Sequence, residues 1–225
     1  MKIEQPTFQI LQYTPNMTKL IERAGRICWK SEERIEEGSD TKFIEMIKGV
    51  NHESVLEHGT ISVLFSTDRG VTHELVRHRI CSFSQSSTRY CNYSKGKFGG
   101  EITVIEPFFF DKDSVQYATW KNSCEEAEFS YLALINAGAK AQEARSVLPN
   151  SLKTEIVVTC NVREWRKIFE LRTSNAAHPQ IRQIMCPLLG LFRKNWNVLF
   201  NDVGSIDHPC PAMIVEGDID YEQDL

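Results

Sequence analysis

The residues best suited to chemistry gather in one short stretch of the chain, residues 77–90 (RHRICSFSQSSTRY). The stretch combines three arginines and a histidine with serine, threonine and glutamine side chains, and it contains no carboxylate. Planar guanidinium groups bind phosphates and carboxylates through paired N–H donors. Because an unpaired charge that is removed from water is very costly, these arginines require an anionic partner. The stretch therefore predicts an anion pocket for a phosphorylated small molecule, although a solvated helix end with surface salt bridges is the blander interpretation.

A strand followed by a short helix is expected to position this stretch. Apolar and polar residues alternate over 60–66, which is typical of a strand with one buried face. Thr67 or Asp68 can cap the helix that follows, and this helix is expected to carry Arg77, His78 and Arg79 at its far end. The serine-rich residues 82–88 cannot continue a helix comfortably, so we expect a loop or an irregular strand with exposed backbone amides.

Further helices are marked by their capping residues. Asp113 or Ser114 is expected to open a long helix. Asn161, with Glu164 three positions later, forms a capping arrangement for a second helix. Residues 178–179 (His-Pro) are expected to open the last helix.

Length and composition indicate one ordinary globular domain. The chain has 225 residues, of which 41% are hydrophobic and 25% are charged, so disorder and coiled coil are not indicated. We expect a single domain over residues 1–225 of the α+β class, with a small, mainly antiparallel twisted sheet packed by helices. Residues 202–225 hold seven acids and neither Lys nor Arg, and we expect this acidic tail to lie at the surface or to be partly disordered.

Charge, hydropathy and cysteine content restrict the function classes. The net charge of −4 argues against general nucleic-acid binding. The apolar runs are too short to span a membrane, and no secretory signal opens the chain. The seven cysteines (28, 81, 91, 124, 160, 186 and 210) form no CxxC pair, which favours reduced thiols over a disulfide framework or a zinc site. We therefore expect a cytoplasmic protein with no metal, no membrane association and no nucleic-acid partner.

Four further blocks connect residues 77–90 to a known family. Within that stretch, Arg-His-Arg is followed after seven residues by Ser87 and then by Arg89. The other blocks, in chain order, are His52-Glu53-Ser54-x-x-Glu57-His58, Ala144-Arg145-x-x-Leu148-Pro149, Asn161-x-Arg163 and Leu171-Arg172. Any one block is weak evidence, because short patterns recur by chance. Together, in the family's order and nearly its spacing, they make the chain resemble the flavin-dependent thymidylate synthases.

The resemblance implies a reaction and a set of partners. The reaction is the reductive methylation of dUMP at C5, with 5,10-methylenetetrahydrofolate as carbon donor and NADPH, through FAD, as hydride source. Its products are dTMP and tetrahydrofolate. The family forms homotetramers with active sites at subunit junctions. No Rossmann glycine pattern precedes a helix in this sequence, so side chains must hold the cofactor.

Site residues are carried over at the matching positions. The resemblance assigns FAD binding to Ser54, Glu57, Arg77, His78, Arg79, Gln85, Asn161, Arg163 and Lys167. It assigns dUMP binding to Glu74, Arg77, Gln85, Ser86, Ser87, Arg89, Arg145 and Arg172. Arg172 takes the catalytic place, because hydride addition to a uracil ring creates enolate-like charge that a fixed guanidinium stabilises more than it stabilises the neutral substrate.

The sequence departs from the family pattern at a few positions. Glu74 stands where members often have Gln, which places a carboxylate near the phosphate site. It either turns toward His78 or Arg77 or accepts a hydrogen bond from the pyrimidine. Ser84 and Gln85 replace the commoner Asn and Glu.

Three histidines, His52, His58 and His78, each allow a structural as well as a functional interpretation. His52 and His58 stand six residues apart, so they do not share one helical face as a zinc motif requires. The resemblance instead places His52 on the folate or flavin side, while a capping or hydrogen-bonding role is the bland interpretation of Glu57. His78 is either an ordinary core histidine or a ring that the flanking cations hold neutral against a ligand.

Other chemistries remain as alternatives. The segment His208-Pro209-Cys210-Pro211 is similar to the Pro-Cys nucleophile of the folate-only thymidylate synthases, but an inert thiol in a turn is preferred. Ser87 has no paired base in the sequence, so a donor role explains it as well as a nucleophilic one. A flavin-free nucleotide-binding or phosphate-ester enzyme could use the same arginines, but it would be colourless. A nucleic-acid binding module would show steeply salt-dependent binding.

Overall fold

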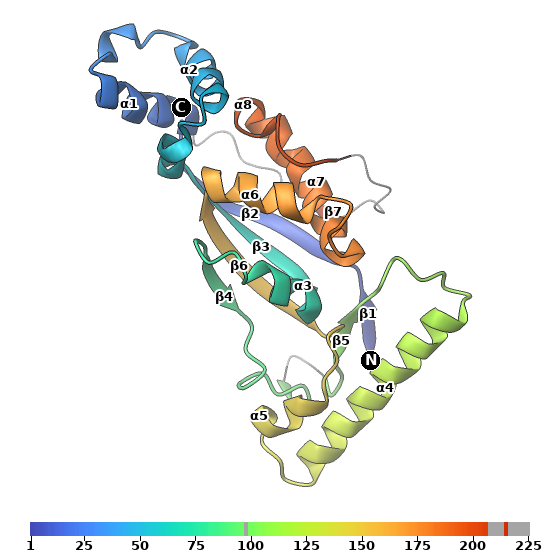
Figure 1. Cartoon of the computed structure of the whole chain (residues 1–225). Coiled ribbons are helices and arrows are strands. Elements are labelled where there is room, and N and C mark those ends of the chain that lie inside the picture. The colour runs from blue at the N-terminus through green and yellow to red at the C-terminus, as the bar shows by residue number, and fades with distance from the viewer. Residues whose placement is uncertain (97–98, 207–213, 216–225) are drawn as a thin grey trace. The chain divides into compact units, whose positions relative to one another are not determined.

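The computed structural model describes residues 1–96, 99–206 and 214–215, and the chain forms two compact units (Figure 1). The first unit consists of Met1–Thr7, Phe65–Arg77 and Ser84–Ile156. The second consists of Phe8–Leu64, His78–Phe83 and the chain from Val157 onward. The chain therefore passes between the units at positions 7–8, 64–65, 77–78, 83–84 and 156–157. Most of the acidic tail and the whole segment 208–211 lie outside the described residues.

Five strands form the main sheet in the order β4-β6-β3-β2-β7. They are β2 (Thr7–Tyr13), β3 (Thr60–Asp68), β4 (Ser82–Gln85), β6 (Lys153–Asn161) and β7 (Ile214–Val215). The hydroxyls of Ser62 and Thr159 are 2.8 Å apart, and the Arg69 N–H donates to the Leu152 carbonyl at 3.2 Å. Residue numbers thus rise along β3 as they fall along β6, so these strands are antiparallel. The expected α+β class with a small antiparallel sheet is confirmed.

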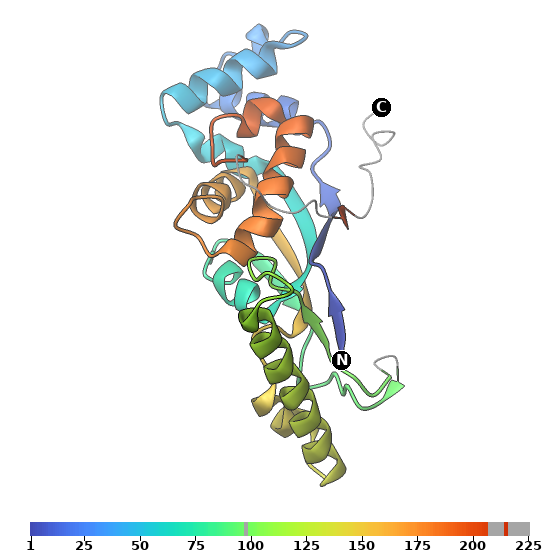
Figure 2. The same ribbon diagram turned by 90° about the vertical axis from the view of Figure 1, so that its right-hand side faces the viewer.

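In the second unit, helices cover one face of its strands (Figure 2). The helices of this unit are α1 (Met17–Trp29), α2 (Ser39–Gly49), α6 (Val162–Arg172), α7 (Pro179–Asn195) and α8 (Asn197–Phe200), with the 3₁₀ helices η1 (Glu32–Arg34) and η2 (Glu53–His58). Figure 1 shows α6 and α7 over the strands, and α1 and α2 beyond the end of the strands. Buried Trp165 fixes α6, because its indole N–H donates to the Ile61 carbonyl of β3 at 3.0 Å. Its ring also packs against Phe169 and Phe192. The aromatic core therefore sets the position of α6, which carries several of the predicted site residues.

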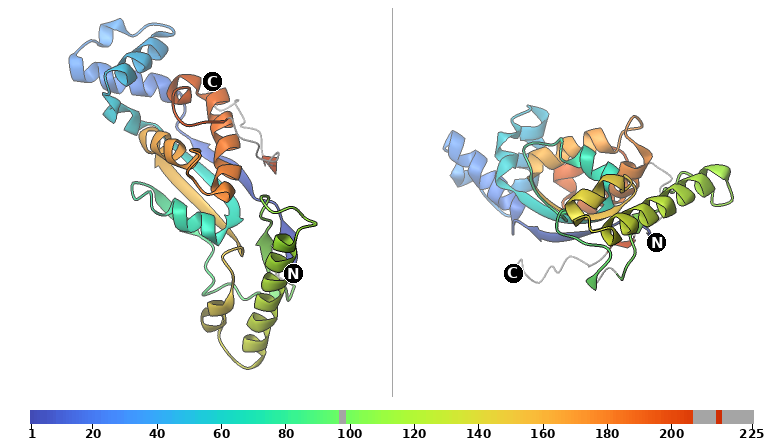
Figure 3. Two further views of the ribbon diagram at one scale, coloured as in Figure 1. Left: turned by 45° about the vertical axis from the view of Figure 1, so that its right-hand side comes forward. Right: turned by 90° about the horizontal axis from the view of Figure 1, so that it is seen from below.

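In the first unit, α3 (Arg69–Leu75) and α4 (Val115–Asn136) begin at expected caps. Asp68 accepts from the Val71 N–H at 2.7 Å, and Ser114 accepts from the Tyr117 N–H at 3.1 Å. Figure 3 follows α4 into α5 (Ala141–Ala144), after which come η4 (Arg145–Val147) and β6. The parallel pair β1 (Lys2–Glu4) and β5 (Thr103–Ile105) also belongs to this unit. No helix among residues 1–96 and 99–206 is long and apolar enough to cross a membrane.

The expectation of reduced thiols is wrong for one pair of cysteines. Cys81 and Cys160 form a disulfide, with their Cα atoms 4.7 Å apart. The Ser86 N–H donates to the Glu155 carbonyl at 2.9 Å, so β4 and β6 are antiparallel neighbours and the two cysteines face each other across the ladder. Spacing along the sequence does not reveal such a cross-strand pair. The free cysteines among the described residues are Cys28, Cys91, Cys124 and Cys186.

Candidate functional site

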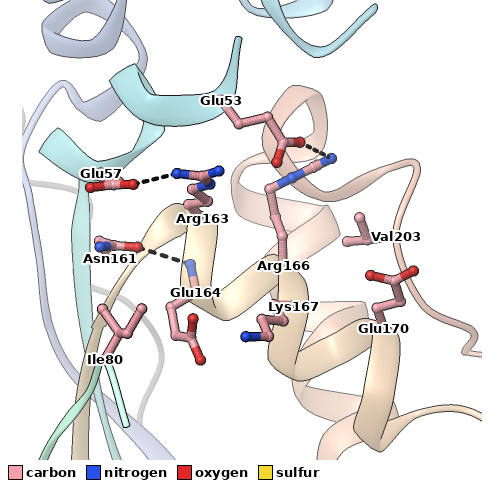
Figure 4. A pocket seen from close by; sticks show the side chains of 10 residues that line it. All are labelled: Glu53, Glu57, Ile80, Asn161, Arg163, Glu164, Arg166, Lys167, Glu170 and Val203. Carbon is pink, nitrogen blue, oxygen red and sulfur yellow. Dashed lines mark hydrogen bonds and ion pairs between the residues drawn. The ribbon is translucent and has the colours of Figure 1, made fainter. Parts of the chain in front are cut away.

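A cavity of about 530 Å³ opens in the second unit beside the first turns of α6 (Figure 4). Its lining residues come from η2, the segment 78–83, α6 and the chain after α8, and they are Glu53, Glu57, Ile80, Asn161, Arg163, Glu164, Arg166, Lys167, Glu170 and Val203. Four of the predicted FAD residues, Glu57, Asn161, Arg163 and Lys167, are among them. The fold thus brings together two blocks, at 52–58 and 161–163, that lie far apart in the sequence.

Two of these residues pair at the mouth of the cavity. The Arg163 guanidinium donates to the Glu57 carboxylate at 2.7 Å, and each side chain is about half exposed (50% and 47%). Asn161 is the cap of α6, since its side-chain oxygen accepts the Glu164 N–H at 2.8 Å (Figure 4). This capping was expected from the sequence and is confirmed. It fixes where α6 begins and therefore where Arg163 and Lys167 leave the helix.

A second cavity of about 320 Å³ adjoins the same arginine. It is lined largely by apolar and aromatic side chains of α1 and α2, together with His52 and Ser54. The His52 ring lies 6.1 Å from the Trp29 ring, centroid to centroid. Arg163 therefore lines the cavity that contains Glu57 as well as the cavity that contains Ser54.

His78 lies at the centre of a buried polar group. Its Nε2 accepts from the Arg172 Nε–H at 3.1 Å, and its Nδ1 is 3.4 Å from the Glu164 carboxylate. Only 4% of the His78 side chain and 6% of the Glu164 side chain are exposed. Burial and then the Arg172 charge lower the His78 pKa, although Glu164 acts in the opposite direction. The lowered pKa favours the neutral ring, which is the direction that the sequence suggested, but its first cause is burial rather than the flanking Arg77 and Arg79.

Two predicted cations of the second unit are exposed. Arg79 follows His78 directly, and Lys167 projects from α6 toward the cavity (Figure 4). In the part of the chain that the structure describes, neither side chain has an ion-pair partner. Their charge is therefore left for an anionic ligand.

The predicted nucleotide residues Gln85 and Ser86 lie in the first unit at the end of β4. The Gln85 amide nitrogen donates to the Thr72 hydroxyl at 2.9 Å and to the Thr154 hydroxyl at 3.2 Å. This pair of threonines fixes the amide and leaves its oxygen as the acceptor. The Ser86 N–H donates to the Glu155 carbonyl at 2.9 Å, and the contact of Ser86 with the nucleotide stays a prediction.

A tight turn follows at Ser87. Its hydroxyl accepts the Arg89 N–H at 3.3 Å, and its carbonyl accepts the Cys91 N–H at 3.0 Å. The Arg89 guanidinium lies over the Tyr90 ring at 5.6 Å and is exposed. The turn thus presents a serine hydroxyl and a guanidinium on neighbouring residues.

Arg145, Glu74 and Arg77 complete the predicted residues of the first unit. Exposed Arg145 in η4 donates to the Thr88 hydroxyl at 3.3 Å. Half-buried Glu74 lies in the last turn of α3, and exposed Arg77 follows that helix. Within the described residues neither Arg77 nor Arg145 forms an ion pair. The structure thus groups the predicted residues into one set on each unit.

Sequence reasoning missed two residues of α6. Glu164 was considered only as a capping partner, yet it lies one turn before buried Ile168 and therefore on the inner face of the helix. A carboxylate on a buried face needs a partner, and this signal could have identified it. Arg166 is also buried, and it donates to the Leu199 carbonyl and to the carboxylates of Asp202 and Glu53 at 2.7–3.1 Å. Its role is to join α6 to α8 and η2.

Sequence comparisons identify one family. The family described as thymidylate synthase complementing protein (Thy1) matches residues 9–196. A flavin-dependent thymidylate synthase of Geobacter sulfurreducens is 31% identical over 211 residues, which cover 90% of this chain and 89% of the relative. One from Pyrococcus furiosus is 36% identical over 187 residues, covering 80% and 76% of the two chains.

Two solved structures share the fold. The UMP/dUMP methylase PolB from Streptomyces cacaoi, bound with 5-Br dUMP, has a TM-score of 0.74 at 21% identity and covers 89% of this chain and 96% of its own. Thymidylate synthase X (ThyX) from Helicobacter pylori, with FAD and dUMP, has a TM-score of 0.73 at 24% identity and covers 90% and 100%. At these identities the likeness establishes a common fold.

Proposed function

The chain belongs to the flavin-dependent thymidylate synthases, and from this premise we propose which of its residues carry the reaction. It is an FAD-dependent enzyme that methylates dUMP to dTMP. We assign 5,10-methylenetetrahydrofolate as the carbon donor and NADPH as the hydride source. FAD, when bound, supplies the hydride transfer.

The donors around the larger cavity fit a flavin dinucleotide. Arg79, Arg163 and Lys167 provide positive charge for a pyrophosphate, and two of the three line the cavity. Because Arg163 is paired only at an exposed position, it can exchange Glu57 for a phosphate at little cost. The proposed FAD residues are Ser54, Glu57, Arg77, His78, Arg79, Gln85, Asn161, Arg163 and Lys167.

The residues of the first unit suit a uridine monophosphate. We assign the phosphate to Arg89, Arg145 and the Ser87 hydroxyl, because both guanidinium groups are exposed. The Gln85 amide, fixed by two threonines, offers its oxygen to the base or the sugar. The remaining proposed contacts are Glu74, Arg77 and Ser86.

Arg172 is the proposed catalytic residue. Its Nε–H is bonded to His78, which fixes one edge of the planar guanidinium. A cation fixed before the reaction stabilises the charge that develops on the uracil carbonyls and N3 without reorganising. It therefore favours the transition state over the neutral substrate.

A homotetramer with active sites at subunit junctions completes the proposal. Several anionic ligands share each site, so cations from more than one chain are needed. Large apolar side chains on α4, such as Val115 (79% exposed) and Phe129 (75% exposed), are available for contacts between copies. Light scattering on active enzyme tests this assembly, and a monomer that turns over would refute it.

One observation carries the proposal: the blocks at 52–58 and 161–163 converge on one cavity whose cations suit FAD. The test is the visible spectrum of the purified protein, followed by addition of dUMP, the folate and NADPH. We expect a bound-flavin spectrum and formation of dTMP that depends on all three additions. A colourless protein that binds or hydrolyses nucleotides would instead support the flavin-free alternative.

A further inference from the structure

The buried neighbours of His78 form a chain of three groups within the second unit. Glu164 lies beside Nδ1 at 3.4 Å, and Arg172 donates its Nε–H to Nε2 at 3.1 Å. The three residues come from the segment 78–83 and from the two ends of α6. The three hydrogen-bonded groups therefore connect the first turn of α6, which carries Glu164, to its last residue, Arg172.

The position of the proton on the His78 imidazole decides whether Glu164, His78 and Arg172 can form both hydrogen bonds. A neutral histidine has one donor nitrogen and one acceptor nitrogen. Arg172 can only donate, so Nε2 must accept and the proton must lie on Nδ1. At Nδ1 the Glu164 carboxylate, which can only accept, receives it. The carboxylate and the guanidinium thus select the same tautomer from opposite sides of the ring.

The capping of α6 does not explain why the Glu164 carboxylate is buried. The cap of α6 is Asn161, which accepts the Glu164 backbone N–H, so the carboxylate is not needed there. Its side chain is 6% exposed, and a buried carboxylate is costly unless it is bonded. The charged groups that act on His78 are Glu164 and Arg172, with Lys167 adding a weaker effect.

We propose that Glu164 is a positioning residue, which fixes the tautomer of His78 and through it the orientation of the catalytic Arg172. The proposal rests on the assignment of Arg172 as the catalytic residue. Without the carboxylate, the imidazole is free to carry its proton on Nε2, where it meets the Arg172 Nε–H donor to donor. The guanidinium then loses the bond that fixes its edge, although its charge remains.

The first test uses the apo protein and does not depend on turnover. The ring nitrogens of His78 are observed by NMR in protein labelled with ¹⁵N-histidine, and His78→Gln assigns the signals. We expect the Nδ1–H tautomer in the wild type and a shift toward Nε2–H in Glu164→Ala. The same tautomer in both proteins would overturn the proposal.

The second test separates positioning from folding and from cofactor binding. Glu164→Ala is expected to lower kcat by roughly 10- to 100-fold, as the loss of outer-shell partners typically does. The flavin content and the KM for dUMP should stay within about threefold of the wild type, because the charge of Arg172 remains. Glu45→Gln, which removes an exposed carboxylate on α2, is the matched control and should behave as wild type. If Glu164→Ala fails to fold, Glu164→Met, which has a similar size but offers no oxygen to the Nδ1–H, decides the question.

The pH profile gives a signature that a merely structural role does not produce. Protonation of His78 turns Nε2 into a donor, so kcat should fall as pH drops through the His78 pKa. That pKa lies below its ordinary value, and the Glu164 charge raises it relative to burial and Arg172 alone. Glu164→Gln should therefore move the acid limb of kcat to lower pH. An unmoved limb with wild-type kcat would overturn the proposal.

The outcomes also separate this proposal from the proposed function. If the wild type forms no dTMP, or if Arg172→Ala keeps near-normal turnover, the assigned function or its catalytic residue is wrong. If the wild type is active and Arg172→Ala is inactive while the Glu164 variants match Glu45→Gln, only the positioning role is wrong.

Discussion

The two units hold their predicted site residues in different ways. In the second unit, three of these side chains bond to other protein groups: Arg172 to His78, Arg163 to Glu57, and Asn161 to the start of α6. In the first unit the arginines 77, 89 and 145 are exposed, and none of them forms an ion pair within the described residues. The proposed catalytic Arg172 thus has a protein partner before a ligand arrives. The proposed nucleotide cations instead await the phosphate as their counter-charge.

This difference indicates that the second unit serves mainly catalysis and the first unit mainly substrate binding. Prior bonding fixes geometry, which a catalytic group needs because only a preorganised charge favours the transition state. Exposed cations steer an anionic substrate and release water readily, which suits binding. Changes in the second unit should therefore affect kcat or stability, and changes in the first unit should affect the KM for dUMP.

The largest expected effect comes from the disulfide of the second unit. It links residues separated by 79 positions, and closing a loop of this length lowers the entropy of the unfolded chain, which stabilises the fold by about 4 kcal/mol. We expect dithiothreitol to lower the free energy of unfolding by that amount in chemical denaturation. It should also free two additional thiols for titration in the denatured protein.

A double variant provides the control for the disulfide. Cys81→Ser with Cys160→Ser should unfold like the reduced wild type and should not respond to dithiothreitol. Equal denaturation midpoints for the oxidised and reduced wild type would show that the second unit does not depend on this bond.

Arg172→Ala tests preorganisation at the catalytic position. Loss of one well-placed donor typically lowers the rate by about 10²- to 10³-fold, so we expect kcat to fall by that factor while FAD remains bound. Steady-state kinetics and the flavin spectrum measure the two quantities. Arg23→Ala, an exposed arginine of α1, should leave both unchanged. If Arg172→Ala mainly raised the KM for dUMP and left kcat unchanged, the proposed difference between a catalytic second unit and a substrate-binding first unit would be wrong.

Arg145→Ala tests the first unit. A hydrogen bond to a charged group contributes about 1.5–3 kcal/mol, so the KM for dUMP should rise roughly 10- to 100-fold with a smaller change in kcat. Lys121→Ala, on the exposed side of α4, is the matched loss of a cation and should have no such effect. Added salt should weaken dUMP binding to the wild type more than to Arg145→Ala.

The smallest expected effect comes from Glu57→Gln. The Arg163–Glu57 pair is about half exposed, and exposed ion pairs contribute less than about 1 kcal/mol. The free energy of unfolding should therefore change by less than that amount, as thermal or chemical denaturation can show. A much larger loss would mean that the mouth of the cavity is part of the structural core of the second unit.

Local chemistry made much of the fold predictable. The caps Asp68, Ser114 and Asn161 accept the backbone N–H groups that the sequence assigned to them, because a cap and its partner stand only a few residues apart. The sequence also predicted that no helix continues through the serine-rich residues 82–88, and the structure has the strand β4 beginning at Ser82.

Contacts between residues that lie far apart in the chain could not be predicted from the sequence. His78 and Arg172 are 94 positions apart, and no local pattern shows that a histidine will meet an arginine at that distance. The disulfide is hidden in the same way, because the register of β4 on β6 brings its cysteines together. The family resemblance supplied the predicted residues of the site, whereas the partner of Glu164 became known only from the packing of α6.

The path of the chain between the units limits how this protein can be divided. Within the short stretch 77–90, the chain crosses from the first unit to the second at 77–78 and returns at 83–84. No single uninterrupted piece of the gene encodes either unit alone. A gene that stopped after residue 156 would encode the first unit entire, but it would leave the second unit without the part that begins at Val157. A single cut in the chain therefore cannot separate the first unit from all of the second.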